Sequence, residues 1–481
     1  MKVQTSKIME KFFGREKELQ AIRRLILSSR SEFLAVYGRR RVGKTMLIRE
    51  ALQQKFTFRL TAIGHATKSQ QLMNFHTTLK KMVDPQTNLP VPTNWFEAFQ
   101  QLIEFLEATK EERKLVFFDE LPWFDTAKSD FMPSLEHFWN SWASYRSDVV
   151  LIACGSAASW MINELINHKG GLHNRLTARI RLEPFTLKEA EAMLKDKNSA
   201  IDRYQIIQIF MVTGGIPFYL SSFDGELSAM QNIETLCFTN DGPLRNEFNN
   251  LFPALFSTSE RHISIVEAIA GKNKGLTRAE IIEATHLPSN GSTTKLLMEL
   301  EESGFVRKYT PFGRGKRESL YQLIDLYTLF YLKFIRNDEL LDENNWINAM
   351  ESSTYRAWSG YAFELVCLCH IQQIKLGLSI AGMVTKAASW RGKNRDKSTQ
   401  IDLLIDRRDH VINLCEIKFS QQKFTINKEY TSQLERKIAI FKEDTTTQKA
   451  VWLTMLTTFG LVENEYSRRL VQKSLTMDVL F

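Results

Sequence analysis

Short, continuous runs of apolar residues alternate with helical patterns over the first 185 residues of the chain. The apolar runs cover 33–37, 115–118 and 149–153. Runs that are apolar at consecutive positions are typical of strands covered on both faces of a parallel sheet. The pattern therefore predicts a doubly wound α/β domain over residues 1–185.

The pattern becomes mostly helical after Pro184 and Phe185. Thr186 and Glu189 form a capping box, in which a cap residue and the residue three places on satisfy free N–H groups of the first helical turn. From there to about residue 255 the helical pattern continues. We expect a helical lid over 186–255.

Residues 256–337 have the pattern of a winged helix-turn-helix. The expected elements are a helix at 263–269, a second helix opened by the capping box of Thr277 and Glu280, a third helix capped by Ser292 and ended by Gly304, and a hairpin of 305–309 and 320–323. The hairpin encloses a basic wing at 312–317, which contains Arg314, Lys316 and Arg317.

An acidic, polar stretch at 338–345 predicts a linker, and an α/β pattern with its own core follows it. The patterns together divide the chain into four segments: 1–185, 186–255, 256–337 and 338–481.

The composition fits a folded protein with large cores. Of 481 residues, 43% are hydrophobic and 25% are charged, which excludes a disordered, collagenous or disulfide-scaffold chain. The five cysteines show no metal-binding spacing, and most of them lie in apolar runs, so we expect buried thiols. No apolar run is long enough to span a bilayer, and the start lacks the apolar stretch of a signal peptide. We therefore expect a cytoplasmic protein without a membrane partner.

The charge balance is basic. The chain has 63 Lys and Arg against 55 Asp and Glu, which gives a net charge of +8. A basic excess is compatible with a nucleic-acid partner, and equally with solubility alone.

A complete P-loop occupies residues 38–45, with the sequence Gly-Arg-Arg-Arg-Val-Gly-Lys-Thr. It follows an apolar strand and precedes a helix, which is the context this motif requires. Gly38, Arg41 and Gly43 are expected to contribute to a loop whose backbone N–H groups wrap phosphates. Lys44 would reach the β- and γ-phosphates and Thr45 would ligate Mg²⁺. The loop therefore predicts a site for ATP and Mg²⁺.

Polar residues end the next two apolar strands. Asp119 and Glu120 follow the strand at 115–118, where Asp119 would hold Mg²⁺ through water and Glu120 would polarise the attacking water. Ser156 ends the strand at 149–153 and is a candidate sensor of the γ-phosphate. These residues predict ATP hydrolysis as well as binding.

Three arginines follow this strand, and Arg175, Arg179 or Arg181 is a candidate arginine finger that stabilises charge on the transferred phosphoryl group. The alternative is that all three are solvated or structural residues.

The order of these motifs resembles the archaeal-type AAA+/STAND ATPases, which also occur in bacteria. The resemblance adds a Gly14-Arg15-Glu16 head that would lie near the adenine, and a Gly-x-Pro ending at Pro217 that would contact the nucleotide after the lid. It also implies a winged helix behind the ATPase. Winged helices of this family often pack internally, so both DNA contact and internal packing remain open for the wing.

The C-terminal segment contains a second set of charged residues. Asp402 lies in the apolar run 400–406, and Glu416 follows fourteen residues later, with Lys418 two positions on. If the two runs pair as a hairpin, Asp402 comes alongside Glu416, and Lys418 points to the same face. Carboxylates that hold a hard cation and a lysine that orients water are what Mg²⁺-dependent phosphodiester cleavage needs. Glu364, on an upstream helix, can add a third carboxylate.

This arrangement resembles the PD-(D/E)XK nuclease fold, and more narrowly a domain of unknown function found C-terminal to archaeal-type ATPases. Trp390 before the Asp402 strand agrees with it. Relatives often place an acid two residues before the aspartate, where this chain has Gln400. The alternatives are a nuclease-like fold that only binds, or an unrelated α/β domain.

Two functions follow from these patterns. The first is an ATP-driven switch that controls a DNA-acting, Mg²⁺-dependent C-terminal domain. The second is a nucleotide-regulated binding or scaffold protein whose nuclease-like domain is inactive. The partners expected are ATP and DNA, with a nucleotide-dependent homo-oligomer as a further expectation.

The Cys367-x-Cys369-His370 stretch is expected to be a buried helix face, and we expect Trp346, Tyr355, Trp358 and Tyr361 to be core residues.

Overall fold

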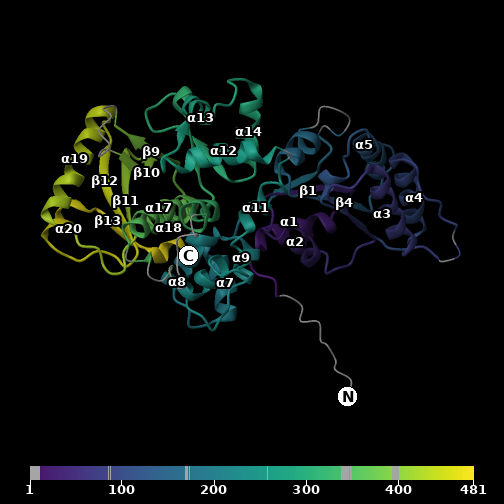
Figure 1. Ribbon diagram of the computed structural model, residues 1–481, viewed down its shortest axis with the longest axis horizontal. Coiled ribbons are helices and arrows are strands. Elements are labelled where there is room, and N and C mark those ends of the chain that lie inside the picture. Colours follow the sequence, from purple (N-terminus) through teal and green to yellow (C-terminus); the bar gives the residue numbers. More distant parts are fainter. Residues whose placement is uncertain are drawn as a thin grey trace, which may run out of the picture. The chain divides into compact units, whose positions relative to one another are not determined.

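The structure, a computed structural model, describes residues 11–84, 86, 88–167, 172, 174–256, 258–336, 346, 349–350, 352–392 and 400–481 (Figure 1). The chain divides into two compact units, Met1–Pro184 and Phe185–Phe481. The division falls beside the boundary expected at 185. The three segments expected beyond it share the second unit, and the expected linker at 338–345 lies outside the described residues.

The first unit contains a five-stranded sheet whose strands are all parallel. Its order is β2-β3-β4-β1-β5, with β1 at Glu32–Tyr37, β2 at Phe58–Thr61, β3 at Lys114–Asp119, β4 at Val149–Gly155 and β5 at Ala178–Arg181. The three predicted strands are confirmed as β1, β3 and β4. Every residue of β4 is buried, as expected for a strand covered on both faces.

The helices of this unit are α1 (Glu16–Ile26), α2 (Lys44–Ala51), α3 (Lys68–Lys80), α4 (Trp95–Ala108), α5 (Phe131–Ser141) and the short α6 (Ala158–Trp160). A cluster of aromatic rings joins α4 and α5 to the sheet. Trp95 packs edge-on against Phe131, with ring centroids 4.9 Å apart, and Phe99 contacts Phe118 of β3. This packing fixes the sheet whose strand ends carry the predicted nucleotide residues.

The second unit begins with the helices α7 (Leu187–Lys197), α8 (Arg203–Thr213), α9 (Pro217–Ser221), α10 (Ala229–Cys237) and α11 (Glu247–Leu251). The predicted capping box is present, because the Thr186 side chain accepts from the Glu189 N–H and Glu189 bonds back to Thr186. The helical character expected for 186–255 is confirmed.

The middle segment, residues 258–336, holds three helices and a small sheet. The helices are α12 (Ser259–Ala270), α13 (Arg278–Thr285) and α14 (Gly291–Glu302); the strands are β6 (Leu276–Thr277), β7 (Val306–Tyr309) and β8 (Leu320–Leu323), in the order β6-β8-β7. The segment ends with α15 (Leu326–Phe330) and a π-helical turn at Tyr331–Ile335.

The predicted cap of α14 is wrong by two residues. Asn290 caps the helix, and its side-chain oxygen accepts from the N–H and the hydroxyl of Ser292, at 3.0 and 2.6 Å. Ser292 is therefore already inside the first turn and serves as a donor. The end at Gly304 is as expected, with a positive φ of 76°.

The C-terminal domain, residues 352–481, has a mixed five-stranded sheet. Its elements are α17 (Ser353–Cys369), α18 (Ile371–Gly377), β9 (Thr385–Arg391), β10 (Gln400–Arg407), β11 (Val411–Lys418), α19 (Lys428–Thr445), β12 (Ala450–Thr457), α20 (Glu465–Leu470) and β13 (Lys473–Thr476). The order is β13-β12-β11-β10-β9; β9, β10 and β11 pair antiparallel, and β12 and β13 run parallel to β11. Leu434 and Phe441 of α19 pack on this sheet.

Of two predictions about buried side chains, one is confirmed and the other holds only in part. Trp346, Tyr355, Trp358 and Tyr361 are all buried core residues. Four cysteines are buried free thiols, whereas Cys369 is exposed, so only part of the Cys367-x-Cys369-His370 stretch is a buried face. In the described part of the chain, no helix is both long and apolar enough to cross a bilayer.

A buried imidazole joins α7 to the C-terminal domain. His370 is only 2% exposed, and its Nε2 accepts a hydrogen bond from the Leu187 N–H at 2.9 Å. Its Nδ1 therefore carries the proton and donates to the carbonyl oxygen of Val366 at 2.7 Å. Burial lowers the pKa of His370 below its ordinary value of 6.5. The folded protein thus holds His370 neutral.

We expect this arrangement to make stability depend on pH. Below about pH 6.5 the unfolded chain takes up a proton that folded His370 resists, so stability is full above that value and falls as the pH drops through it. The test compares thermal unfolding at about pH 7.5 and about pH 5.5, roughly one unit above and below the ordinary histidine pKa. Between these two values, the midpoint of unfolding should fall less in His370→Gln than in wild type. His370→Ala should cost about 1–3 kcal/mol at neutral pH, because the Leu187 N–H loses its acceptor. Equal pH dependence in wild type and His370→Gln would contradict this role.

Candidate functional site

The predicted P-loop is the turn between β1 and α2. Gly38 has a φ of 147°, and a Cβ there would lie 2.3 Å from the carbonyl oxygen of Leu182, so only glycine fits. Gly43 has a φ of 89° and immediately precedes α2. Arg41, between them, also has a positive φ, 71°. The loop therefore has the sharply turned backbone that allows successive N–H groups to face one anion.

Phosphate and Mg²⁺ binding by such a loop depends on a lysine and a hydroxyl, and both are in place. Lys44 is buried, and its ammonium donates to the carbonyl oxygens of Gly38 and Arg39 at 3.0 and 2.9 Å. The Thr45 hydroxyl donates to the Asp119 carboxylate at 3.0 Å. The two residues predicted to hold Mg²⁺ thus lie together although 74 positions separate them in the chain.

Asp119 ends β3 in a buried position. Burial is the main cause that raises the pKa of Asp119, and the neighbouring Glu120 carboxylate adds to it. An interaction with the Cys154 thiol of β4 partly offsets this rise in the pKa of Asp119. The sequence analysis did not identify Cys154; its placement depends on the pairing of β3 with β4.

Glu120 and Ser156 contact each other. Glu120 has a positive φ of 53°, an uncommon conformation that turns its side chain out of the line of β3. Its carboxylate accepts from the Ser156 N–H at 3.2 Å and from the Ser156 hydroxyl at 2.7 Å. The candidate water-polarising acid and the candidate phosphate sensor are therefore one hydrogen-bonded pair.

The Gly14-Arg15 head lies beside the P-loop. Both residues have positive φ, 64° and 63°. The Arg15 guanidinium donates to the carbonyl oxygen of Glu183 at 2.7 Å and to that of Val42, in the P-loop, at 3.4 Å. The head is thus anchored to the backbone of the predicted nucleotide site.

The remaining predicted nucleotide residues stay predictions. Arg175 is exposed and Arg181 forms an ion pair with Glu183 at 2.8 Å. Pro217 is the first residue of α9 and belongs to the second unit.

These residues fit ATP and Mg²⁺. The loop offers backbone donors and a buried ammonium for phosphate, and the Thr45–Asp119 pair offers oxygen ligands of the kind that Mg²⁺ prefers. When bound, Mg²⁺ neutralises charge that develops on the phosphate oxygens. The protein supplies the positioned lysine, the hydroxyl and the Glu120 carboxylate.

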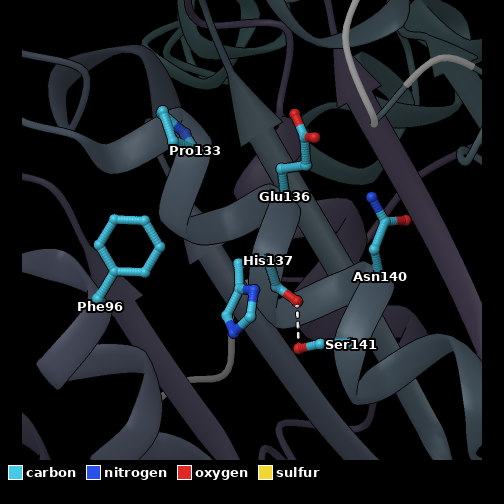
Figure 2. Close-up of a pocket in the computed structure, with 6 residues that line it drawn as sticks. All are labelled: Phe96, Pro133, Glu136, His137, Asn140 and Ser141. Carbon is cyan, nitrogen blue, oxygen red and sulfur yellow. Dashed lines mark hydrogen bonds between the residues drawn. The ribbon is translucent and has the colours of Figure 1, made fainter.

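A separate hollow of about 470 Å³ lies between α4 and α5 and does not involve these residues. Figure 2 shows its lining: Phe96, Pro133, Glu136, His137, Asn140 and Ser141. The Ser141 hydroxyl donates to the carbonyl oxygen of His137 at 2.6 Å, a bond within α5. It is a shallow surface feature without the charge pattern of a phosphate site.

The C-terminal acids also come together as predicted. Leu403 of β10 pairs with Cys415 of β11, and continuing that antiparallel register by one position places Asp402 opposite Glu416. Lys418 lies on the same face as Glu416, with its ammonium 3.1 Å from the Glu416 carboxylate. Together with Glu364 of α17, these carboxylates form what we call the acid site.

Glu416 is fully engaged by its neighbours. The Lys437 ammonium lies 2.7 Å from Glu416 Oε2, and the Tyr430 hydroxyl donates to Oε1 at 2.7 Å. These contacts keep the pKa of Glu416 low, about 2, despite burial. Lys437 and Tyr430 were missed by the sequence analysis, although their spacing of seven residues on α19 places them on one helix face.

The other two acids are half-buried and are less compensated than Glu416. Burial and the nearby Asp402 raise the pKa of Glu364 to about 8. Burial and Glu416 raise the pKa of Asp402 as well. The Gln400 amide donates to Asp402 Oδ1 at 2.8 Å and so occupies one of the oxygens of this carboxylate.

The acid site in this arrangement does not fit a metal ion. Within the described residues, no group of three His, Cys, Asp or Glu side chains is arranged to hold one. The oxygen donors suit Mg²⁺ chemically, but the Glu416 oxygens are occupied by Lys437, Lys418 and Tyr430. The ammonium groups of Lys418 and Lys437 contact the carboxylate oxygens that a metal ion would need as ligands.

Residues 12–223 match the family described as an ATPase domain predominantly from Archaea. The chain contains an archaeal-type ATPase domain. The matched range extends from the Gly14-Arg15 head through the P-loop to the end of α9. This match supports ATP hydrolysis as an activity of the domain.

The chain is similar to one protein in sequence and to others in solved structures. An uncharacterized protein of Methanocaldococcus jannaschii, MJECL04, is 23% identical over 430 residues, which cover 89% of this chain and 91% of that protein. The Walker-type ATPase PABY2304 of Pyrococcus abyssi has a similar fold, with a TM-score of 0.50 and 18% identity, over 67% of this chain and 96% of that one. The ORC2 protein of Aeropyrum pernix has a TM-score of 0.41 and 14% identity, over 72% of this chain and 98% of that one.

Two variants should separate ATP binding from hydrolysis. Lys44→Ala should remove measurable binding of a fluorescent ATP analogue, because the phosphate charge loses its buried ammonium. Glu120→Gln should still bind, since Asp119 and Thr45 are intact, but should hydrolyse ATP on the order of 10²–10⁴ times more slowly. Phosphate release under saturating ATP measures the second effect. Normal turnover by Glu120→Gln would mean that the water is activated elsewhere, and unchanged affinity in Lys44→Ala would exclude that residue from the site.

Proposed function

We propose that this protein is an ATP-hydrolysing switch that controls a DNA-acting C-terminal domain. The observation that carries the proposal is the placement of Asp402 opposite Glu416 on adjacent antiparallel strands, with Lys418 on the same face. The element order α17-β9-β10-β11-α19-β12 agrees with the resemblance to the PD-(D/E)XK fold. The ATPase half rests on the domain match and on the Thr45–Asp119 contact.

The second unit offers a physical route for coupling. The helices α7 and α8 lie within the matched ATPase range, and both contact the C-terminal domain. Tyr204 of α8 stacks on Phe419 and packs at a tilt against Phe459, with ring centroids 5.3 and 5.2 Å apart. Phe419 directly follows Lys418. A displacement of α8 during the ATPase cycle would therefore reach the strand that carries Glu416 and Lys418.

A second candidate function is favoured by the occupied Glu416 carboxylate. A domain that binds DNA without cutting it needs cationic groups but no metal ligands, and three lysines surround these acids. On this alternative, the protein is a nucleotide-regulated binding or scaffold protein.

The middle segment is proposed to act as a winged helix. Its helices α12, α13 and α14 and its hairpin have the expected order, and Lys316 and Arg317 of the wing are exposed. Arg314 instead pairs with Glu318 at 3.1 Å. The Phe312 N–H donates to the carbonyl oxygen of Ser389 in β9 at 2.7 Å, a contact that supports internal packing of the base of the wing.

The proposal is tested with the full chain and plasmid DNA. DNA affinity should differ between ATP and ADP in wild type and should lose that difference in Lys44→Ala. Cleavage should require Mn²⁺ or Mg²⁺ and should be abolished in Asp402→Ala. DNA binding without cleavage under every nucleotide would select the binding alternative, and neither binding nor cleavage would contradict the DNA-acting function altogether.

The wing makes a separate prediction about salt. Each phosphate contact contributes about 0.9 to the slope of log affinity against log salt, so Lys316→Ala combined with Arg317→Ala should flatten the slope by up to about 1.8. The matched control, Lys188→Ala with Arg468→Ala, removes two exposed charges outside the middle segment and should leave the slope unchanged. An unaltered slope in the wing variant would assign the wing to internal packing.

A further inference from the structure

A turn of the middle segment, residues 272–275, is fixed against the C-terminal domain by its backbone. The carbonyl oxygen of Asn273 accepts from Gln322 Nε2 at 2.9 Å and from the Tyr361 hydroxyl of α17. The next carbonyl oxygen, that of Lys274, accepts from the Tyr309 hydroxyl at 2.7 Å. Hydrogen bonds from both the small sheet and α17 therefore determine where Lys274 lies.

The conformation of this turn requires glycine at position 275. Its φ is 84°, and a Cβ there would lie 2.3 Å from the carbonyl oxygen of Tyr321. Only glycine tolerates this close backbone approach. The fold therefore fixes the backbone from which the Lys274 side chain extends.

Lys274 lines the same cavity as two carboxylates of the acid site. The cavity measures about 40 Å³ and is lined by residues of the middle segment, α17, β9 and β10. The charged groups that line it are Lys274, Arg307, Glu364, Arg391 and Asp402. A space of this size holds about one water molecule, whereas Mg²⁺ usually keeps several of its waters. The cavity is therefore closed to a hydrated divalent cation.

The cations around this cluster are sufficient to compensate its three carboxylates without a metal. Lys437 and Lys418 contact Glu416 at 2.7 and 3.1 Å, which leaves Glu364 and Asp402 to be compensated. Lys274 shares the cavity with both of these carboxylates, as do Arg307 and Arg391. Carboxylates brought this close repel one another, and of the cations that line the cavity Lys274 is the one carried by the 272–275 turn.

We propose that Lys274 is a tethered counter-ion that closes the acid site, so that a divalent cation enters only when the middle segment withdraws it. The inference rests on the proposed function of the acid site and adds a positioning residue from outside the C-terminal domain. It explains why three acids brought together by the fold do not form a metal site in this arrangement.

The first test uses the stability of the full chain without metal. Lys274→Met keeps the length and apolar stem of the side chain and removes its charge. It should lower the midpoint of thermal unfolding in wild type, and lower it less when Glu364 is replaced by Gln, because the charge that needs compensation is then gone. Lys272→Met is the matched control from the same turn; it loses only the pair with Glu280 and should show no coupling to Glu364. Additive effects of Lys274→Met and Glu364→Gln would overturn the counter-ion role.

The second test measures Mn²⁺ binding to nucleotide-free full chain by calorimetry. Lys274→Met should bind Mn²⁺ at least about tenfold more tightly than wild type, and Asp402→Asn should abolish that gain. Equal, measurable affinity in wild type and Lys274→Met would overturn the closing role while leaving a metal-binding acid site intact. Absence of binding in both proteins would overturn the closing role and also the metal-dependent form of the proposed function.

Discussion

The parallel pairing of β1, β4 and β3 is the constraint on which the nucleotide site depends. Because parallel strands end at the same edge of a sheet, the P-loop after β1, Asp119 at the end of β3 and Ser156 after β4 meet there. The hydrogen bonds from Thr45 to Asp119 and from Ser156 to Glu120 are consequences of that register. A shift of β3 against β4 would break both bonds and the contact of Cys154 with Asp119.

The two charged sites balance their buried groups in opposite ways. In the P-loop, the Lys44 ammonium rests on neutral carbonyl oxygens, so the loop keeps a net positive charge for an anion. In the acid site, lysines from three different elements compensate three carboxylates. The first site is therefore ready for its ligand, whereas the second must exchange an internal partner before it binds anything. This difference makes the acid site the more natural point of control.

Local and periodic signals account for what could be predicted from the sequence. The strands at 33–37, 115–118 and 149–153 were predictable because both their faces are buried, and the capping boxes at Thr186 and Thr277 because they involve neighbouring residues. The cap of α14 was misplaced because Asn290 and Ser292 are both good caps and lie two residues apart. Lys437 could have been found from its helical spacing to Tyr430. No sequence pattern indicates Lys274, because its role depends on how the 272–275 turn packs against Tyr361 and Tyr309.

The bond between the Phe312 N–H and Ser389 has a consequence for self-association. β9 is an edge strand of the C-terminal sheet, and this bond lets the wing cover part of an edge whose backbone groups would otherwise be free to pair. If the middle segment moves away to withdraw Lys274, it uncovers that edge at the same moment. Release of the acid site would then expose a strand able to extend the sheet of a second molecule, so that opening and filament-like or paired assembly become one event rather than two.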